Sequence, residues 1–508
     1  MSKEYLIVMD VPGIKEYVFG TDRLVEIRGA SALLADLNCE ETEIHLKKSL
    51  TGKTVKKVFS NGGAGQFIIQ ANKDEILNAL KALRGYFFQK SGGAIRLIFG
   101  IAEYVDNQYQ ASLDSAFLAL KKDKEEKVFF TPQNSHMGYI RECDSCSGMA
   151  MHVSKYADEN RHLCSVCYEK EIYGRDSGKG LWKQFNAYLK KYKRLEVERP
   201  RDFEDIGRLC QAKPGYTALV YADGNSMGRL IKKIETDEQF KFFSETVDSA
   251  IHEACYDAIS KHCLVDEREA AADILLLGGD DLLVYLSADR AIPFAIDVAE
   301  CFNKKTTDAM SKDLFFSKLL GHRGLSVSLG VVFGKSHTPF SIMLDQAEEM
   351  LVSAKKAGAS DDRAGDNFSP AYIDYHFSPR FNQVHVEDCR SAHLVLHHHE
   401  LAYLYDKPYS LEDMKVLSEF AAMLVNADVP RSRLKRLGYA PATGRLNATL
   451  ECIKLIKRSK KEHQDIMVKA LTHFSCYGDA IPWKNKTSDG KSYYTTSLVD
   501  LVELTEFV

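Results

Sequence analysis

Two runs of apolar residues, each of strand length, flank a short polar segment near the middle of the chain. The runs are 274–277 and 282–285, and the segment between them is Gly278-Gly279-Asp280-Asp281. This pattern predicts a β-hairpin with two adjacent carboxylates at its tip, where the glycines leave room for a ligand close to the backbone. Because adjacent carboxylates repel each other, a divalent cation would be favourable beside them, and oxygen ligands suit Mg²⁺ or Mn²⁺. Considered alone, the four residues are also compatible with an ordinary acidic turn.

The same order of apolar segments occurs twice along the chain. Each copy has a strand that ends in an aspartate, a helical segment, a hairpin with a Gly-Gly tip, a further strand and a helix that ends in Lys-Lys. In the first copy these features occupy residues 5–10, 14–37, 58–69, 95–102 and 112–122. In the second copy they occupy residues 217–223, the segment from 224 onward, 274–285, 325–332 and 339–356. We therefore predict an α+β fold with two ferredoxin-like βαββαβ domains, although α/β proteins also look repetitive by chance.

The two copies differ in their acidic residues. Asp10 and Asp223 occupy matching strand ends, but the first copy has Ala64-Gly65 where the second has Asp280-Asp281. The second copy therefore keeps a set of three carboxylates, and the first copy keeps one. We expect a catalytic second copy and a degenerate first copy that completes a pocket across a pseudo-two-fold axis.

Four cysteines are clustered between the two copies. They form the pairs Cys143-x-x-Cys146 and Cys164-x-x-Cys167, with residues 147–163 between them. Two such pairs at this spacing predict a zinc ribbon in which four thiolates bind one Zn²⁺ tetrahedrally. A site with four protein ligands has no open position, so we expect a structural role for the zinc. A redox role for either pair is the alternative.

Composition and charge restrict the partners and the location of the protein. The net charge of −4 and the pI near 6.5 give no overall sign of nucleic-acid binding, so any such contact would be local. The basic and aromatic segment 179–201 is a candidate RNA contact, and a solvated amphipathic helix is at least as consistent with it. The start of the chain lacks the apolar core of a signal peptide, and no apolar run reaches the roughly 18 residues that span a bilayer. We expect a cytoplasmic protein with reduced cysteines and no membrane contact.

The length of 508 residues and the hydrophobic content of 45% indicate a folded protein of several domains. We expect the first copy at 1–130, the zinc-ribbon insertion with a helical linker at 131–210, the second copy at 211–370 and a helical C-terminal domain at 371–508. A helical pattern at 448–459 carries several lysines and predicts a basic face in the last domain, most simply a solvated surface.

The order of these parts resembles that of a known protein family. The segments 11–18 (Val-Pro-Gly-Ile-Lys-Glu-Tyr-Val), 28–31 (Arg-Gly-Ala-Ser) and 221–228 (Tyr-Ala-Asp-Gly-Asn-Ser-Met-Gly) are similar to the starts of the two palm domains in the large polymerase-cyclase subunit of type III CRISPR effectors, the Csm and Cmr complexes. That family has two palm domains related to nucleotide cyclases, a zinc ribbon between them, a helical C-terminal domain and a Gly-Gly-Asp-Asp motif in the second palm only. Many members begin with a histidine-aspartate nuclease domain, whereas this sequence has no His-Asp dipeptide and is short for the family. We therefore expect no DNA cleavage by this chain, and a reduced or absent guide-RNA complex.

The carboxylates and the resemblance together predict a nucleotidyltransferase that uses two Mg²⁺ or Mn²⁺ ions. The expected catalytic and metal-binding residues are Asp223, Asp280 and Asp281. The expected nucleotide-binding residues are Gly224, Asn225, Ser226, Met227, Gly228, Gly278, Gly279 and Lys355. The turn at 224–228 would offer backbone N–H groups to a triphosphate, and Lys355 would reach the β- and γ-phosphates as the matching lysine does in related cyclases.

The predicted reaction joins AMP units from ATP through 3′–5′ linkages into a cyclic oligoadenylate that acts as a second messenger in antiviral defence. The resemblance implies ATP, other subunits and guide or target RNA as partners. One alternative is the same site with another product, either a cyclic dinucleotide or an AMP adduct of S-adenosylmethionine. Further alternatives are a cyclase that uses GTP and a non-catalytic scaffold that binds nucleotide or RNA.

Overall fold

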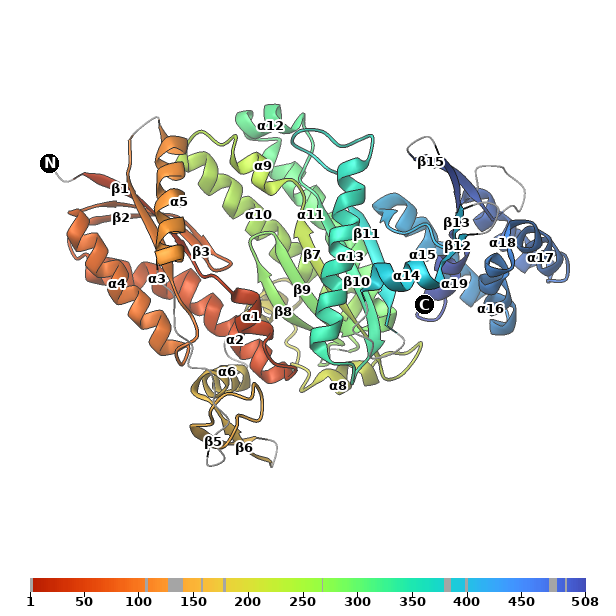
Figure 1. Ribbon diagram of the computed structural model, residues 1–508, viewed down its shortest axis with the longest axis horizontal. Coiled ribbons are helices and arrows are strands. Elements are labelled where there is room, and N and C mark those ends of the chain that lie inside the picture. Colours follow the sequence, from red (N-terminus) through yellow and green to blue (C-terminus); the bar gives the residue numbers. More distant parts are fainter. Residues whose placement is uncertain are drawn as a thin grey trace.

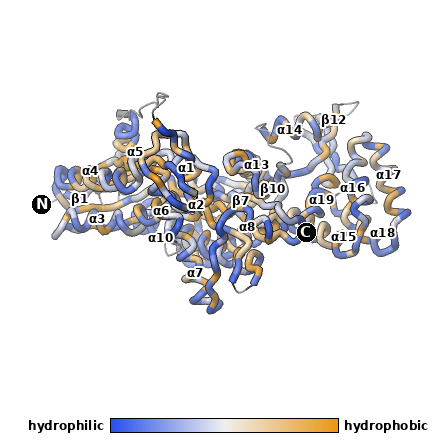
Figure 2. The backbone as a smooth tube through the Cα atoms, turned by 90° about the horizontal axis from the view of Figure 1, so that it is seen from below, coloured by the Kyte–Doolittle hydropathy of each residue, from blue (hydrophilic) through white to orange (hydrophobic). Residues whose placement is uncertain are grey.

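Two sheets with the same order of strands form the centre of the chain (Figure 1). The computed structural model describes residues 3–105, 108–126, 140–156, 159–176, 180–266, 268–378, 385–397, 401–474, 482–488 and 491–508. Figures 1 and 2 show the first copy at one end of the molecule, the second copy in the middle and the C-terminal elements at the other end. In the described part of the chain, no helix combines the length and the apolar character needed to cross a membrane.

The first copy is a four-stranded antiparallel sheet with helices on both faces. Its elements are β1 (Glu4–Asp10), α1 (Ile14–Phe19), α2 (Leu24–Asp36), α3 (Thr42–Ser49), β2 (Thr54–Asn61), β3 (Ala64–Gln70), α4 (Lys73–Lys90), β4 (Ile98–Glu103) and α5 (Tyr109–Glu126). The strand order β2-β3-β1-β4 is that of a ferredoxin-like βαββαβ unit.

The second copy repeats this order. Its elements are β7 (Tyr216–Gly224), α9 (Met227–Ile231), α10 (Asp237–Ala258), β8 (Ala272–Gly278), β9 (Asp281–Ser287), α11 (Ala291–Met310), α12 (Leu314–Leu320), β10 (Val327–Lys335) and α13 (Phe340–Ser360). The order β10-β7-β9-β8 corresponds to β4-β1-β3-β2 of the first copy. Two strands that follow residue 370, β11 (Tyr372–Phe377) and β14 (Tyr409–Ser410), extend this sheet, so it continues past the expected boundary of the C-terminal domain.

The two copies share their helices. Alternate residues of β7 point to opposite faces, where Ala218 and Val220 belong to the apolar cluster that includes α10 and α11, and Leu219 and Tyr221 to the cluster that includes α13. Helix α2 of the first copy packs on β8 of this sheet. In return, α10 of the second copy packs on β2 of the first. Each sheet is therefore covered partly by the first long helix of the other copy, which is the arrangement expected for a pseudo-two-fold axis.

Glycines at matching positions let the last helix of each copy lie close to its strand. A Cβ atom on Gly330 of β10 would overlap the backbone oxygen of Ala347 in α13, and a Cβ atom on Gly100 of β4 would overlap that of Ala116 in α5. The backbone nitrogen atoms of Leu351 and Leu120 are the next neighbours of these two positions. The helices are therefore in register at these leucines.

This register corrects one detail of the repeat. The residue four places after Leu351 is Lys355, and the residue four places after Leu120 is Lys124. Lys124 is therefore the counterpart of Lys355, whereas the sequence had suggested the pair Lys121-Lys122. Lys124 also interacts electrostatically with Asp10, as expected for this counterpart.

The hairpins correct a second detail. Asn61 pairs with Ala64 across a two-residue turn, and Gly278 pairs with Asp281 across an equivalent turn. The pairing of β1 with β3 and of β7 with β9 gives the same alignment. Asp280-Asp281 therefore corresponds to Gly63-Ala64, one residue before the expected Ala64-Gly65. The sequence alignment matched the glycine pairs by identity, whereas strand pairing sets the true register.

The inserted segment packs on the first copy, at the bottom of Figure 1. It contains β5 (His152–Tyr156), β6 (Glu159–Leu163) and α6 (Ser165–Arg175), followed by α7 (Gly180–Lys193) and α8 (Phe203–Arg208). In α7 the aromatic rings of Trp182 and Phe185 are buried, which supports the interpretation as an amphipathic helix. An RNA contact at this segment stays a prediction.

The C-terminal part is not purely helical, contrary to the sequence expectation. Its helices are α14 (Val386–His393), α15 (Leu411–Asn426), α16 (Arg431–Tyr439), α17 (Arg445–Lys457), α18 (Lys461–His473) and α19 (Leu498–Leu504). This part also contains a separate four-stranded sheet. Its strands are, in spatial order, β12 (Val395–His397), β13 (Leu401–Tyr403), β16 (Lys491–Thr495) and β15 (Lys484–Ser488). These strands are too short for a clear period-two pattern in the sequence.

Replacing Gly330 by alanine should lower the free energy of unfolding by about 1–3 kcal/mol, because the added methyl group would force α13 away from β10. Gly85, on the exposed side of α4, is the matched control, since nothing lies within 4 Å of the position of its Cβ atom. Gly85→Ala should raise stability by about 0.5–1 kcal/mol through helix propensity. Denaturant unfolding measures both changes, and equal stability of the two variants would contradict the close packing.

Candidate active site and metal centre

The structure brings the three expected carboxylates to one edge of the second copy. Asp223 lies near the end of β7, and Asp280 and Asp281 lie at the tip of the β8–β9 hairpin. Because Ala222 pairs with Leu282, the next residues along the two strands, Asp223 and Asp281, lie side by side. A Cβ atom on Gly224 would lie 2.7 Å from Oδ2 of Asp280, so this carboxylate lies directly against the backbone after Asp223.

Burial and neighbouring negative charge raise the energy of the ionised forms of Asp280 and Asp281. Burial, followed by the charge of Asp223 and a hydrogen bond with it, raises the pKa of Asp280 to about 6. Burial, followed by the charges of Asp223 and Asp280, raises the pKa of Asp281 to about 7. The edge therefore carries more negative charge than its surroundings stabilise.

Lys355 of α13 supplies positive charge at this edge. Its Nζ atom forms an ion pair with Oδ2 of Asp223 and donates a hydrogen bond of 3.0 Å to the backbone oxygen of Gly224. Lys355 and Asp223 are both partly exposed to solvent, so the pair faces an accessible edge. The expected lysine thus contacts the expected aspartate, although they lie 132 residues apart.

The carboxylates match the donor set that Mg²⁺ or Mn²⁺ prefers, because they are hard oxygen ligands whose mutual repulsion a divalent cation would relieve. Among the described residues, however, they do not form a compact group of ligand atoms such as the cysteines form. Asp223 is instead engaged by Lys355. Ion binding here therefore requires a rearrangement of these side chains.

The turn after β7 has one side fixed by the protein and one side open. Asn225 is buried, and its side chain donates to Ser326 Oγ at 2.9 Å and to the Pro370 backbone oxygen at 3.3 Å. Met227 is also buried. These two expected nucleotide-binding side chains therefore anchor the turn. Ser226 and Gly228 remain at the accessible side.

Two basic residues near the site were missed by the sequence analysis. Arg229 donates to Ser226 Oγ at 2.6 Å, and its position one turn after the expected phosphate contact was a usable signal. Lys15 comes from α1 of the first copy, pairs with Glu348 at 2.7 Å and lies 5.2 Å from the centre of the Tyr221 ring. Its charge lowers the pKa of Asp281 against the effect of burial. No local pattern connects Lys15 with the second copy.

The tip of the hairpin is backbone that can approach a ligand closely. Gly279 has φ of +64°, and nothing lies within 4 Å of the position of its Cβ atom. Gly278 is buried, and a Cβ atom there would lie 2.8 Å from Oδ1 of Asn61 in the first copy. The expected space for a ligand is therefore present at Gly279, whereas Gly278 makes room for a neighbouring side chain.

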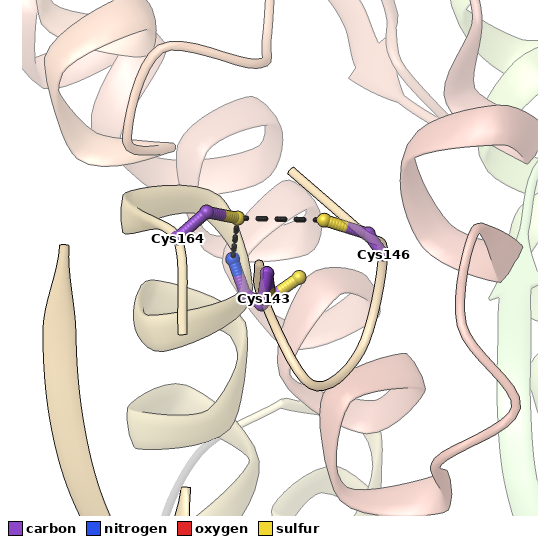
Figure 3. Close-up of side chains that lie close together, drawn as sticks. Cys143, Cys146 and Cys164 are labelled. Atoms are coloured by element: carbon purple, nitrogen blue, oxygen red, sulfur yellow. Dashed lines mark hydrogen bonds between the residues drawn. The ribbon is translucent and has the colours of Figure 1, made fainter. Parts of the chain in front are cut away.

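The four cysteines of the inserted segment form a second candidate metal centre. One ligand atom from each of Cys143, Cys146, Cys164 and Cys167 lies within 4.8 Å of the others. Figure 3 shows three of these side chains directed toward one another. The sulfur atoms of Cys146 and Cys164 are 3.6 Å apart. Four thiolates at this separation fit a tetrahedral Zn²⁺ ion.

Buried charges attach this centre to the first copy. Glu26 of α2 accepts hydrogen bonds of 2.6 Å from Arg161 and from Ser145, which lies between two of the cysteines. The helices α2 and α6 cross closely at Gly29 and Gly174, where Cβ atoms would overlap backbone oxygens of the other helix. A metal ion held by the cysteines would therefore fix the position of Arg161 beside α2.

Comparison with known families addresses the second copy directly. Residues 216–364 match the family model described as Cas10/Cmr2, second palm domain. The chain carries a Cas10/Cmr2 second palm domain. Its β7, its hairpin and α13 all lie within the matched residues, and so do Asp223, Asp280, Asp281 and Lys355. The resemblance to the large subunit of type III CRISPR effectors is confirmed by this match together with the solved structures.

Solved structures of Csm1 share the fold of nearly the whole chain. A Csm1–Csm4 cassette in complex with pppApApA is similar to this chain with a TM-score of 0.56 and 12% sequence identity. A Csm1–Csm4 cassette in complex with cA3 is similar with a TM-score of 0.57 and 12% sequence identity. Csm1 of T. onnurineus is similar with a TM-score of 0.56 and 15% identity. Each comparison covers 99% of this chain and 70% of the other. No curated protein matches the sequence. At these identities the likeness shows the fold, in which the Cas10/Cmr2 palm domain occupies the middle of the chain.

Replacing Cys146 by serine should remove the metal from the purified protein, because a neutral hydroxyl replaces one of four thiolates. We expect about one zinc per chain in the parent protein by elemental analysis, and a lower melting temperature in the variant. Cys389→Ser is the control, since Cys389 lies outside the cluster and should leave the zinc content unchanged. Full zinc content in the Cys146 variant would contradict this metal centre.

Replacing Asp281 by asparagine should stabilise the fold more at pH 8 than at pH 4 in the absence of divalent ions. Folding raises the pKa of Asp281 to about 7, so its ionisation opposes folding as the pH rises from about 4 to 7. We expect the gain in melting temperature to be about 2–4 °C larger at pH 8 than at pH 4.

Asp361→Asn should act in the opposite direction at pH 8. Hydrogen bonds from Arg363 and Tyr372 help to lower the pKa of Asp361, so its ionised form stabilises the fold above the unfolded pKa. An equal gain for Asp281→Asn at both pH values would show that Asp281 is not held in a repulsive environment.

Proposed function

We propose that the chain is a nucleotidyltransferase that converts ATP into a cyclic oligoadenylate through 3′–5′ linkages, as part of type III CRISPR or a related antiviral defence. The observation that carries this proposal is the convergence of Asp223, Asp280, Asp281 and Lys355 on one accessible edge of the Cas10/Cmr2 second palm domain. Asp280 and Asp281 have raised pKa values, and repulsion of this kind is costly unless a cation is bound there.

Asp223, Asp280 and Asp281 would hold two Mg²⁺ or Mn²⁺ ions, which supply activation of the attacking ribose hydroxyl and neutralisation of the departing pyrophosphate. Lys355 would leave Asp223 for the β- and γ-phosphates. Ser226 and the N–H groups at the open side of the turn lie on the same edge and would bind phosphate oxygens. Arg229, which lies beside Ser226, would place its positive charge next to the leaving pyrophosphate and stabilise it.

The relatives support this product class. Csm1–Csm4 cassettes that share the fold across 99% of the chain were crystallised with pppApApA and with cA3. We propose that this chain makes products of the same kind from ATP, and that it works with further subunits, as Csm1 does with Csm4. The zinc ribbon would have a structural role.

Replacing Asp280 and Asp281 together by alanine should reduce pyrophosphate release from ATP by about a thousandfold or more, because two metal-binding carboxylates are lost. Both residues lie at a half-exposed hairpin tip, so the melting temperature should not fall. Mass analysis of products from ATP, GTP and ATP with S-adenosylmethionine identifies the reaction in the parent protein.

Lys355→Ala and Lys356→Ala provide a matched pair for the same assay. Lys355 contacts Asp223, whereas its neighbour Lys356 is exposed on the other side of α13. Turnover should fall in the first variant and persist in the second. Persistent turnover in the double aspartate variant would remove the assignment, and RNA binding without any turnover of ATP in the parent protein would favour a scaffold.

A further inference from the structure

The tip of the catalytic hairpin is held by residues outside the carboxylate set. The backbone N–H of Gly279 donates to Oδ1 of Asp248 in α10, at 3.1 Å. The same oxygen accepts a hydrogen bond from Nδ2 of Asn61, the last residue of β2 in the first copy. One carboxylate oxygen therefore joins three elements: the catalytic hairpin, α10 and the hairpin of the first copy.

The two hairpin tips also touch directly. Oδ1 of Asn61 accepts a hydrogen bond of 2.7 Å from the N–H of Gly62, which fixes the orientation of the amide. This oxygen lies where a side chain on Gly278 would begin. Strand pairing makes Asn61 and Gly278 counterparts in the two copies. The side chain of Asn61 thus occupies the space where a side chain at position 278 would lie. An asparagine at both positions would not fit.

Asp248 has a fixed position relative to the first copy. The first turn of α10 carries a capping box formed by Thr236 and Gln239. Close to this end, Asp237 pairs with Lys56 at 2.6 Å, and the ring of Phe240 packs on that of Phe59 with 5.2 Å between their centres. The helix is therefore attached to β2 near its start and again at Asp248, close to its middle.

We propose that Asn61 and Asp248 are positioning residues that hold the Gly279–Asp280 turn against Asp223, so that the first copy keeps the active site of the second in a reactive arrangement. This inference rests on the proposed function. Gly279 directly precedes Asp280, and its backbone N–H donates a hydrogen bond to the side chain of Asp248. Repulsion among the three aspartates pushes the tip away from β7, and the bond to Asp248 opposes that movement.

The test compares a variant that adds a second carboxylate with a double variant that exchanges the amide and the carboxylate. Asn61→Asp places a second carboxylate against Asp248 and should displace the tip. The double variant Asn61→Asp with Asp248→Asn restores one donor and one acceptor, since the new amide can donate to residue 61 and accept from Gly279. Asn72→Ala is the control, because Asn72 caps α4 in the same domain and should affect only stability.

Two measurements are made on each variant. The first is hydrogen–deuterium exchange of the peptide that covers residues 274–285, which needs no activity. The second is pyrophosphate release from ATP, resolved into kcat and KM. We expect Asn61→Asp to exchange faster at the hairpin and to lose about tenfold or more in kcat with little change in KM. The double variant should recover both properties toward those of the parent protein, and Asn72→Ala should change neither.

The two claims fail in different ways. Unchanged exchange at 274–285 in Asn61→Asp, or a double variant no better than Asn61→Asp alone, would overturn the positioning role. Absence of ATP turnover in the parent protein would overturn the proposed function, while the exchange measurement would still decide whether Asn61 and Asp248 hold the hairpin.

Discussion

Repulsion among three carboxylates at one half-buried edge is the constraint around which the second copy is organised. Asp280 and Asp281 cannot avoid each other, because a two-residue turn fixes both at the hairpin tip. Asp223 lies on the neighbouring strand, and burial raises the energy of the negative charges of Asp280 and Asp281 further. Such an arrangement lowers the stability of the fold and persists only where surrounding packing determines it, as is common at functional sites. Lys355 relieves part of the repulsion, and a divalent cation would relieve the rest.

The surrounding packing comes from duplication. Each copy covers a face of its own sheet and lends its first long helix to the other, so neither sheet is complete alone. Helix α2 shows how far this sharing extends. Glu26 on one side of it binds the zinc-ribbon segment through Arg161, and Arg28 forms a buried ion pair of 2.5 Å with Asp273 at the start of β8. Removing one partner of a buried pair usually costs about 3–5 kcal/mol. The strand that ends in the catalytic turn is therefore anchored to the first copy at both of its ends, by Arg28 and by Asn61.

The sequence was informative wherever a signal was local. Two continuous apolar runs on either side of Gly278 to Asp281 predicted the hairpin, cysteine spacing predicted the four-thiolate cluster, and the repeated order of segments predicted two ferredoxin-like sheets. Register and contacts between the copies could not be predicted. Matching the glycines by identity aligned the first hairpin one residue away from its true register. The counterpart of Lys355 is Lys124, because the packing of α5 at Gly100 determines the alignment of this helix and the Lys-Lys pattern does not. That the side-chain amide of Asn225 donates to Ser326 and Pro370, which lie 101 and 145 residues away, could not be predicted from the local sequence. Only the folded chain brings Lys15, Asn61 and Asp248 close to the site, and no local sequence pattern predicts this.

The central claim is that Asp223 and the hairpin aspartates act together on a metal-bound nucleotide. Electron paramagnetic resonance of Mn²⁺ tests it most directly, in a titration of the parent protein and of Asp223→Asn with a non-hydrolysable ATP analogue present. The account predicts that the parent protein binds Mn²⁺ with the nucleotide, that the variant loses this binding, and that zinc content is the same in both. Equal Mn²⁺ binding by the two proteins, or none by the parent protein, would contradict the account.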